Sequence, residues 1–96
     1  MKYIVYVDDN FHFGEEEERY KLDEYDSCLA AKDACMNIVD DFMRRGYREG
    51  ISFKELWEGY MMFGEDPFIV SEDANCRFSA WTYAKQRCRE LTDTHG

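Results

Sequence analysis

The chain has 96 residues, of which 45% are hydrophobic and 17% aromatic, and its formal net charge at pH 7 is −9. This length and apolar content exclude a disordered chain and are typical of one domain with its own core. The longest apolar run, residues 3–7, is far shorter than the ~20 residues of a membrane span, and the negative charge argues against direct binding to nucleic acid. Because the N-terminus also lacks the pattern of a signal peptide, we expect a single cytoplasmic domain over residues 1–96.

Two strands are predicted near the N-terminus. Residues 2–7 are apolar on both faces, which favours an inner strand of a sheet or a strand covered on both sides. Residues 19–25 alternate between apolar and polar side chains, which is typical of a strand with one face in water. The stretch between them, about residues 9–18, is rich in acids, and we expect a mobile loop there.

An amphipathic helix is predicted next, over residues 27–46. Ser27 or Asp26 is placed to cap its first turn, and Gly46 is placed to end it. Both cysteines of this helix are expected to face the core, within an apolar stripe of Cys28, Ala31, Cys35, Ile38, Val39 and Phe42.

A second helix is predicted over residues 52–64. Ser52 and Glu55 have the spacing of a capping box at its start, and Gly64 is expected to stop it. Its apolar side is expected to comprise Phe53, Leu56, Trp57, Tyr60 and Phe63.

The C-terminal third is predicted to contain a turn, a strand and a helix. Asp66 precedes Pro67, which favours extended backbone and a turn, and residues 68–70 have strand character. A last helix is predicted from about residue 78 to 91, followed by a frayed tail at about 92–96. The order β-β-α-α-β-α favours an α+β domain, a small mostly antiparallel three-stranded sheet with about three helices packed on it. The partner of the third strand stays open.

The cysteines are Cys28, Cys35, Cys76 and Cys88, and no two have the spacing of a zinc or redox motif. Cys28 and Cys35 lie about 10 Å apart along one helix, whereas a disulfide needs Cα atoms within roughly 7 Å. A bond between Cys76 and Cys88 is geometrically possible but has no support in the sequence. In a reducing cytosol we expect buried free thiols.

No pattern in the chain assigns a catalytic residue, a cofactor or a metal. The acidic loop fails the calcium-loop template, because counting from Asp8 the sixth residue is Phe13 and the twelfth is Arg19. Nothing local places His12 beside a cysteine as a nucleophile pair. The loop is therefore expected to be a solvated acidic segment.

Exposed apolar and acidic residues give the strongest functional signal. Met61 is expected at the edge of the second helix, Met62 away from its apolar face, and Tyr83 pointing outward from the last helix. Such side chains suit a protein partner or a self-association face. The predicted interaction surface consists of Phe11, Phe13, Glu15, Glu16, Glu17, Glu18, Met61, Met62 and Tyr83.

Charge segregation supports the same interpretation, because residues 1–41 hold twelve acids against four bases and residues 42–96 hold nine against eight. Our leading hypothesis is a non-enzymatic protein-interaction or accessory module. One alternative is a small enzyme with a pocket near the "GEDPF" turn, using Glu65 or Asp66 with His12 or Tyr60. The other is an acidic nucleic-acid mimic that binds a basic protein.

Three segments, "YIVYVDDNFH", "YKLDEYDS" and "FGEDPFIV…FSAWTYAKQRC", resemble a group of small bacterial proteins of unknown function. The resemblance spans nearly the full length, and "FGEDPFIV" is its most distinctive part. It implies a self-contained bacterial cytosolic domain and carries over no activity, substrate or site residue.

Overall fold

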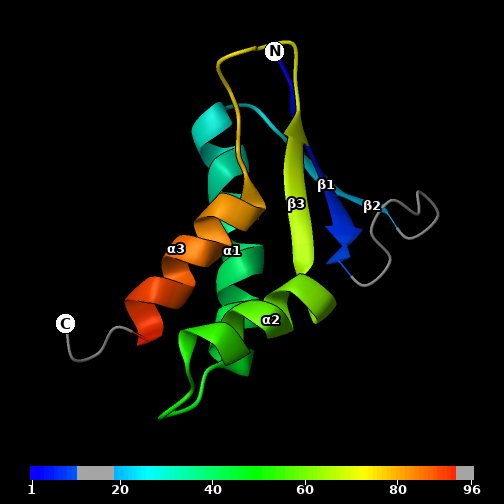
Figure 1. Cartoon of the computed structure of the whole chain (residues 1–96). Coiled ribbons are helices and arrows are strands. Elements are labelled where there is room, and N and C mark those ends of the chain that lie inside the picture. The colour runs from blue at the N-terminus through cyan, green and yellow to red at the C-terminus, as the bar shows by residue number, and fades with distance from the viewer. Residues whose placement is uncertain (11–18, 93–96) are drawn as a thin grey trace.

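The computed structural model describes residues 1–10 and 19–92, and it contains a three-stranded antiparallel sheet with three helices in the described part of the chain (Figure 1). The order β-β-α-α-β-α confirms the predicted α+β fold. The elements are β1 (Tyr3–Asp9), β2 (Tyr20–Tyr25), α1 (Cys28–Gly46), α2 (Phe53–Phe63), β3 (Glu65–Val70) and α3 (Ala80–Thr92).

The sheet has the order β2-β1-β3, so β1 is the inner strand, as its two apolar faces predicted. The third strand pairs with β1, with Val7 opposite Pro67 and Asp9 opposite Glu65. The predicted turn at Asp66 and Pro67 is wrong, because β3 begins at Glu65, directly after the residue that caps α2. Pro67 lies inside an edge strand, where the missing backbone N–H costs no sheet hydrogen bond.

Helix α1 connects two groups of buried side chains. Its N-terminal half buries Ala31 and Cys35 against Val5 and Val7 of β1. Its C-terminal half packs against α2 and α3 in a second core, and Figure 1 shows it running behind α3 and beside the strands. The second core consists of Val39, Met43, Leu56, Tyr60, Ala80, Ala84 and Cys88.

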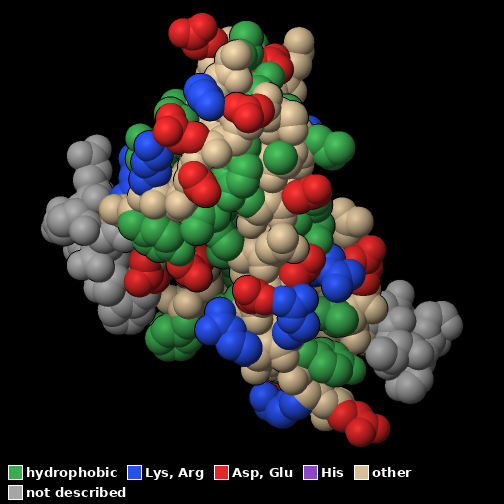
Figure 2. All heavy atoms as spheres, turned by 180° about the vertical axis from the view of Figure 1, so that it is seen from behind, with side chains coloured by type: hydrophobic (Ala, Val, Ile, Leu, Met, Phe, Trp, Pro, Cys, Tyr) green, Lys and Arg blue, Asp and Glu red, His purple; other side chains and the backbone are tan. Residues whose placement is uncertain are grey.

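The opposite side of the sheet carries aromatic side chains as well. Tyr6 and Phe68 are paired in the β1–β3 register and stack with ring centroids 5.9 Å apart. Because successive strand residues point to opposite faces, these rings lie on the side away from Val5 and Val7. The Arg19 guanidinium lies 5.0 Å from the Phe68 ring centroid. Seen from behind, the molecule has hydrophobic side chains gathered across its middle, with acidic and basic ones around them (Figure 2).

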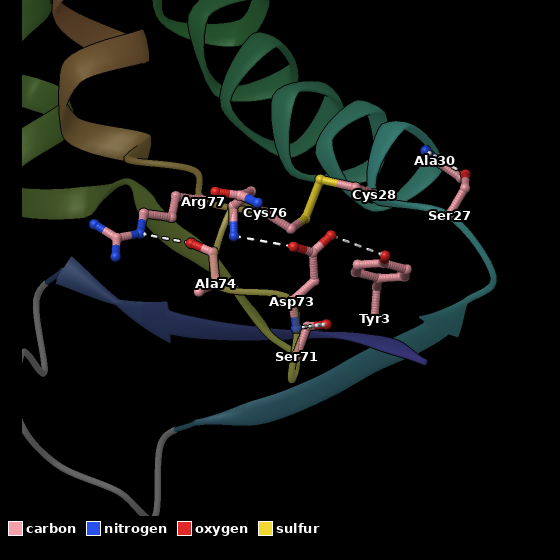
Figure 3. Close-up of a disulfide and its surroundings, with 10 residues drawn as sticks. Tyr3, Ser27, Cys28, Ala30, Ser71, Asp73, Ala74, Cys76 and Arg77 are labelled. Atoms are coloured by element: carbon pink, nitrogen blue, oxygen red, sulfur yellow. Dashed lines mark hydrogen bonds between the residues drawn. A yellow bond between two sulfur atoms is a disulfide. The ribbon is translucent and has the colours of Figure 1, made fainter. Parts of the chain in front are cut away.

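A disulfide joins Cys28 at the start of α1 to Cys76 in the segment before α3, with the Cα atoms 5.7 Å apart (Figure 3). The expectation of four free thiols is therefore wrong for this pair. The two cysteines are 48 residues apart in the sequence, and only the return of the chain from β3 to the start of α1 brings them together. Tyr3 also holds this segment, because its hydroxyl donates to Asp73 Oδ2 at 3.1 Å.

Cys35 and Cys88 are buried and free, as predicted. Burial raises the pKa of the Cys35 thiol to about 12 and that of the Cys88 thiol to about 11.

Among the described residues, no helix has both the length and the apolar character needed to cross a bilayer. Strand β1 extends to Asp9, so the predicted loop starts later than expected. The rest of that loop, 11–18, and the tail residues 93–96 lie outside the described residues.

Candidate functional site

The described residues form two cavities beside the end of the β1–β3 pair. Asp9 and Glu65 face each other in the register and both line the first cavity. The residues that follow them, Asn10 and Asp66, line the second. The C-terminal end of α2 is held beside the end of β1, because the Asn10 backbone N–H donates to the Gly64 carbonyl at 3.0 Å.

The first cavity, which we call the Phe63 cleft, has a volume of about 490 Å³. Phe63 is 63% exposed, although the sequence placed it on the apolar side of the second helix. Phe63 is the last residue of α2, beyond the buried Leu56 and Tyr60, so its ring extends past the core. The cleft is lined by Asp9, Tyr20, Phe42, Arg45, Gly46, Phe63 and Glu65.

The polar groups of the Phe63 cleft are arranged around its aromatic side chains. The Tyr20 hydroxyl donates to Glu65 Oε2 at 2.9 Å, and this contact ties β2 to β3 across the inner strand. Burial and the Glu65 carboxylate raise the pKa of Tyr20 to about 12, so the phenol stays neutral at physiological pH. Arg45 of α1 and Asp9 of β1 supply a charge of each sign.

The second cavity, which we call the Asn10 cavity, has a volume of about 650 Å³, and its described lining residues are Asn10, Asp66, Ser79 and Trp81. Asn10 is only 7% exposed. Its Nδ2 donates to the Tyr60 carbonyl at 2.9 Å, while its Oδ1 has no hydrogen-bond partner within residues 1–10 and 19–92. Burial raises the pKa of the Asp66 carboxyl; Trp81 opposes that rise by a hydrogen bond, and the charge of Asp8 adds to it.

The predicted interaction residues that the structure describes differ in how exposed they are. Met62 is 55% exposed and adjoins Phe63, whereas Met61 is half-buried. Tyr83 does not point freely outward as expected. It is half-buried against the second core, and its hydroxyl donates to the Asp40 carboxylate at 3.0 Å. Phe11, Phe13 and Glu15, Glu16, Glu17 and Glu18 lie outside the described residues.

The three described residues proposed for an enzyme near "GEDPF" line no common cavity within the described part of the chain. Glu65 lines the Phe63 cleft and Asp66 lines the Asn10 cavity. Tyr60 is fully buried, and its hydroxyl donates to the Glu65 carbonyl at 2.7 Å. Burial raises the pKa of Tyr60 far above that of a free tyrosine. His12, the other residue of this prediction, lies outside the described residues.

Within residues 1–10 and 19–92, no group of three or more His, Cys, Asp or Glu side chains is arranged to hold a metal ion. No protein-family model matches the chain, and no curated protein or solved structure is significantly similar to it. Sequence reasoning missed Phe63, Tyr20, Asn10 and Trp81 as surface or cavity residues. A terminal position in a helix is the signal that could have identified Phe63, whereas nothing in the sequence marks Asn10.

Proposed function

We propose that this protein is a non-enzymatic interaction module that receives an apolar side chain of a partner protein in the Phe63 cleft. The observation that carries the proposal is the exposure of two adjacent large apolar side chains, Met62 and Phe63, at the end of α2. Burying such side chains in water-excluding contacts is favourable, and contiguous exposed apolar groups mark interaction sites.

The surroundings of Phe63 have the composition of a protein interface. Aromatic residues, methionine and arginine are enriched at such interfaces, with polar groups at the rim. Here Phe63, Phe42 and Tyr20 supply the aromatic surface, while Arg45 and Glu65 supply charged groups beside it. A volume of about 490 Å³ is ample for one large side chain and its neighbours.

The acidic character of the chain extends the proposal to the nature of the partner. With a net charge of −9, the protein favours association with a partner whose surface is basic around the inserted side chain. The predicted contribution of Glu15, Glu16, Glu17 and Glu18 stays part of this proposal, and so does the alternative that the acidic face mimics a nucleic acid.

A bacterial, cytoplasmic origin is also part of the proposal, and the cysteine pair provides its test. A reducing cytosol keeps most thiols reduced, whereas an oxidising compartment preserves disulfides. A cytoplasmic protein should therefore carry Cys28 and Cys76 as thiols when it is trapped by alkylation in living cells. Recovery of the Cys28–Cys76 disulfide under the same trapping would place the protein in an oxidising compartment instead.

The proposal is tested by quantitative affinity capture with two matched variants. The double variant Met62→Ser and Phe63→Ser removes the exposed apolar end of α2. The control Leu29→Ser changes a side chain that is 70% exposed on the first turn of α1. We expect the double variant to recover about tenfold less partner protein, or even less, while the control recovers the normal amount. Equal partner recovery by both variants, with both folded by circular dichroism, would contradict the proposal.

A further inference from the structure

The connection between β3 and α3, residues 71–79, contains no helix or strand and is tied to the rest of the molecule at few places (Figure 3). Cys76 is bonded to Cys28 at the start of α1, and Asp73 accepts the Tyr3 hydroxyl of β1 at 3.1 Å. The other described hydrogen bonds of the connection join residues that are close in the sequence. The disulfide is therefore its strongest tie to α1.

The connection also lies where the two cores meet. Phe78 packs against both groups of buried side chains. Cys76 is only 6% exposed, whereas its neighbours Asn75 and Arg77 are exposed. Segments that bury few apolar side chains open locally at a low cost in free energy. Releasing Cys76 from α1 should therefore loosen this connection without unfolding the cores around it.

The two sulfurs of the bond differ in access and in chemistry. Cys28 is the first residue of α1 and is partly exposed, so an incoming thiolate reaches it more readily than it reaches Cys76. The N-terminus of a helix stabilises a thiolate, which makes Cys28 a good leaving group. No acidic residue in the first turn opposes this effect, and Asp26, just before the helix, is paired with Lys2 at 2.9 Å.

We propose that the Cys28–Cys76 bond is a reversible redox switch, opened by a dithiol, that releases the 71–79 connection from α1 while both cores stay folded. One thiolate of the dithiol attacks the Cys28 sulfur, the bond to Cys76 breaks, and the Cys76 thiolate takes up a proton. The second thiolate of the dithiol then attacks the dithiol sulfur of the mixed disulfide, and Cys28 leaves as a thiolate. Two electrons pass to the protein, which gains two thiols while the dithiol becomes a disulfide.

This inference does not depend on the proposed function, because neither cysteine lines the Phe63 cleft. Its test is nuclear magnetic resonance relaxation of the backbone amides of the isotope-labelled protein before and after treatment with dithiothreitol. We expect order parameters of about 0.85 over residues 71–77 to fall below about 0.6 on reduction, while those of α2 stay near 0.85. Glutathione disulfide should then restore the first set of values.

Four results would overturn the proposal: a bond that dithiothreitol reduces only in urea, unchanged order in residues 71–77, loss of order throughout the chain, and failure of glutathione disulfide to restore the order. A fifth result concerns the direction of attack. When the reaction with reduced glutathione is quenched early, we expect the mixed disulfide on Cys28, and a mixed disulfide on Cys76 would contradict the proposed step.

Two variants separate the disulfide from the other tie. The double variant Cys28→Ser and Cys76→Ser should show the mobile connection without any reductant. Tyr3→Phe is the matched control, because it removes the hydrogen bond to Asp73 and keeps the disulfide. We expect its connection to stay ordered until dithiothreitol is added. A connection as mobile in oxidised Tyr3→Phe as in the reduced original protein would show that the hydrogen bond holds it, and the proposal would fail.

Discussion

Gly64 is placed between the end of α2 and the start of β3 by a steric requirement. A Cβ added to this residue would lie 2.4 Å from Tyr60 Cδ1 and 2.7 Å from the Tyr60 carbonyl oxygen. Its φ of −77° is accessible to any residue, so space and not backbone freedom demands glycine here. The position also matters for both cavities, because the Gly64 carbonyl accepts the Asn10 N–H.

We therefore predict that Gly64→Ala destabilises the protein by about 1–3 kcal/mol, the usual cost of forcing extra volume into a packed site. Gly59→Ala is the matched control, because a Cβ at that position in α2 meets nothing within 4 Å. Alanine in a helix interior gains about 0.5–1 kcal/mol over glycine, so the control should be stabilised. Urea denaturation measures both values, and equal stability of the two variants would contradict this interpretation of Gly64.

Single residues also show where sequence reasoning ends. The pattern correctly identified Ala31, Cys35 and Val39 as buried, because helical periodicity reports directly on which face meets a core. It could not identify Phe63 as exposed, since periodicity assigns a face but does not say where the neighbouring elements stop. It could not find the contact between the Asn10 side chain and the Tyr60 carbonyl, because these residues are 50 positions apart.

At the scale of elements, the disulfide joins the first turn of α1 to the connection between β3 and α3. This connection is also held locally, because Asp73 Oδ1 accepts the Asn75 N–H at 3.0 Å and Asp73 Oδ2 accepts the Tyr3 hydroxyl (Figure 3). The sequence predicted the elements on both sides but not their meeting, since the two cysteines are 48 residues apart. Fold class follows from local patterns, whereas a cross-link depends on tertiary topology.

We predict that breaking this cross-link lowers the free energy of unfolding by about 2–4 kcal/mol, because a closed loop of this length restricts the unfolded chain strongly. The double variant Cys28→Ser and Cys76→Ser should show the loss in urea denaturation. Adding a reductant should lower the stability of the original protein in the same way and leave the variant unchanged. A reductant effect of equal size in both proteins would show that the stabilisation comes from elsewhere.

At the scale of the whole molecule, three tyrosine hydroxyls hold their protons more tightly than a free tyrosine does: Tyr60 is buried, Tyr83 is half-buried and Tyr20 is partly shielded from water. Burial raises the pKa of Tyr20 and of Tyr83 to about 12, and their hydrogen bonds to Glu65 and Asp40 add to the effect. Burial also raises the pKa of Tyr60 beyond that of these two. At neutral pH these groups are protonated in both the folded and the unfolded states, so they do not affect stability there.

Stability should therefore fall as the pH rises from about 10 towards 12, because the unfolded chain releases phenolic protons that the folded chain retains. Tyr83→Phe removes one of these protons and should reduce the alkaline loss. Urea denaturation at neutral pH and at roughly pH 11 measures the change. A midpoint that stays constant over this range, or that rises, would contradict the raised pKa values of these phenols.

The central claim is that the exposed end of α2, next to the Phe63 cleft, is where a partner protein binds. The most direct measurement is site-specific photo-cross-linking in the native host, with benzoyl-phenylalanine placed at position 63 or at position 29 of α1, which is at least as exposed. We expect a discrete cross-linked product from position 63 and none from position 29. The absence of a product at position 63, or the same product from both positions, would contradict the claim.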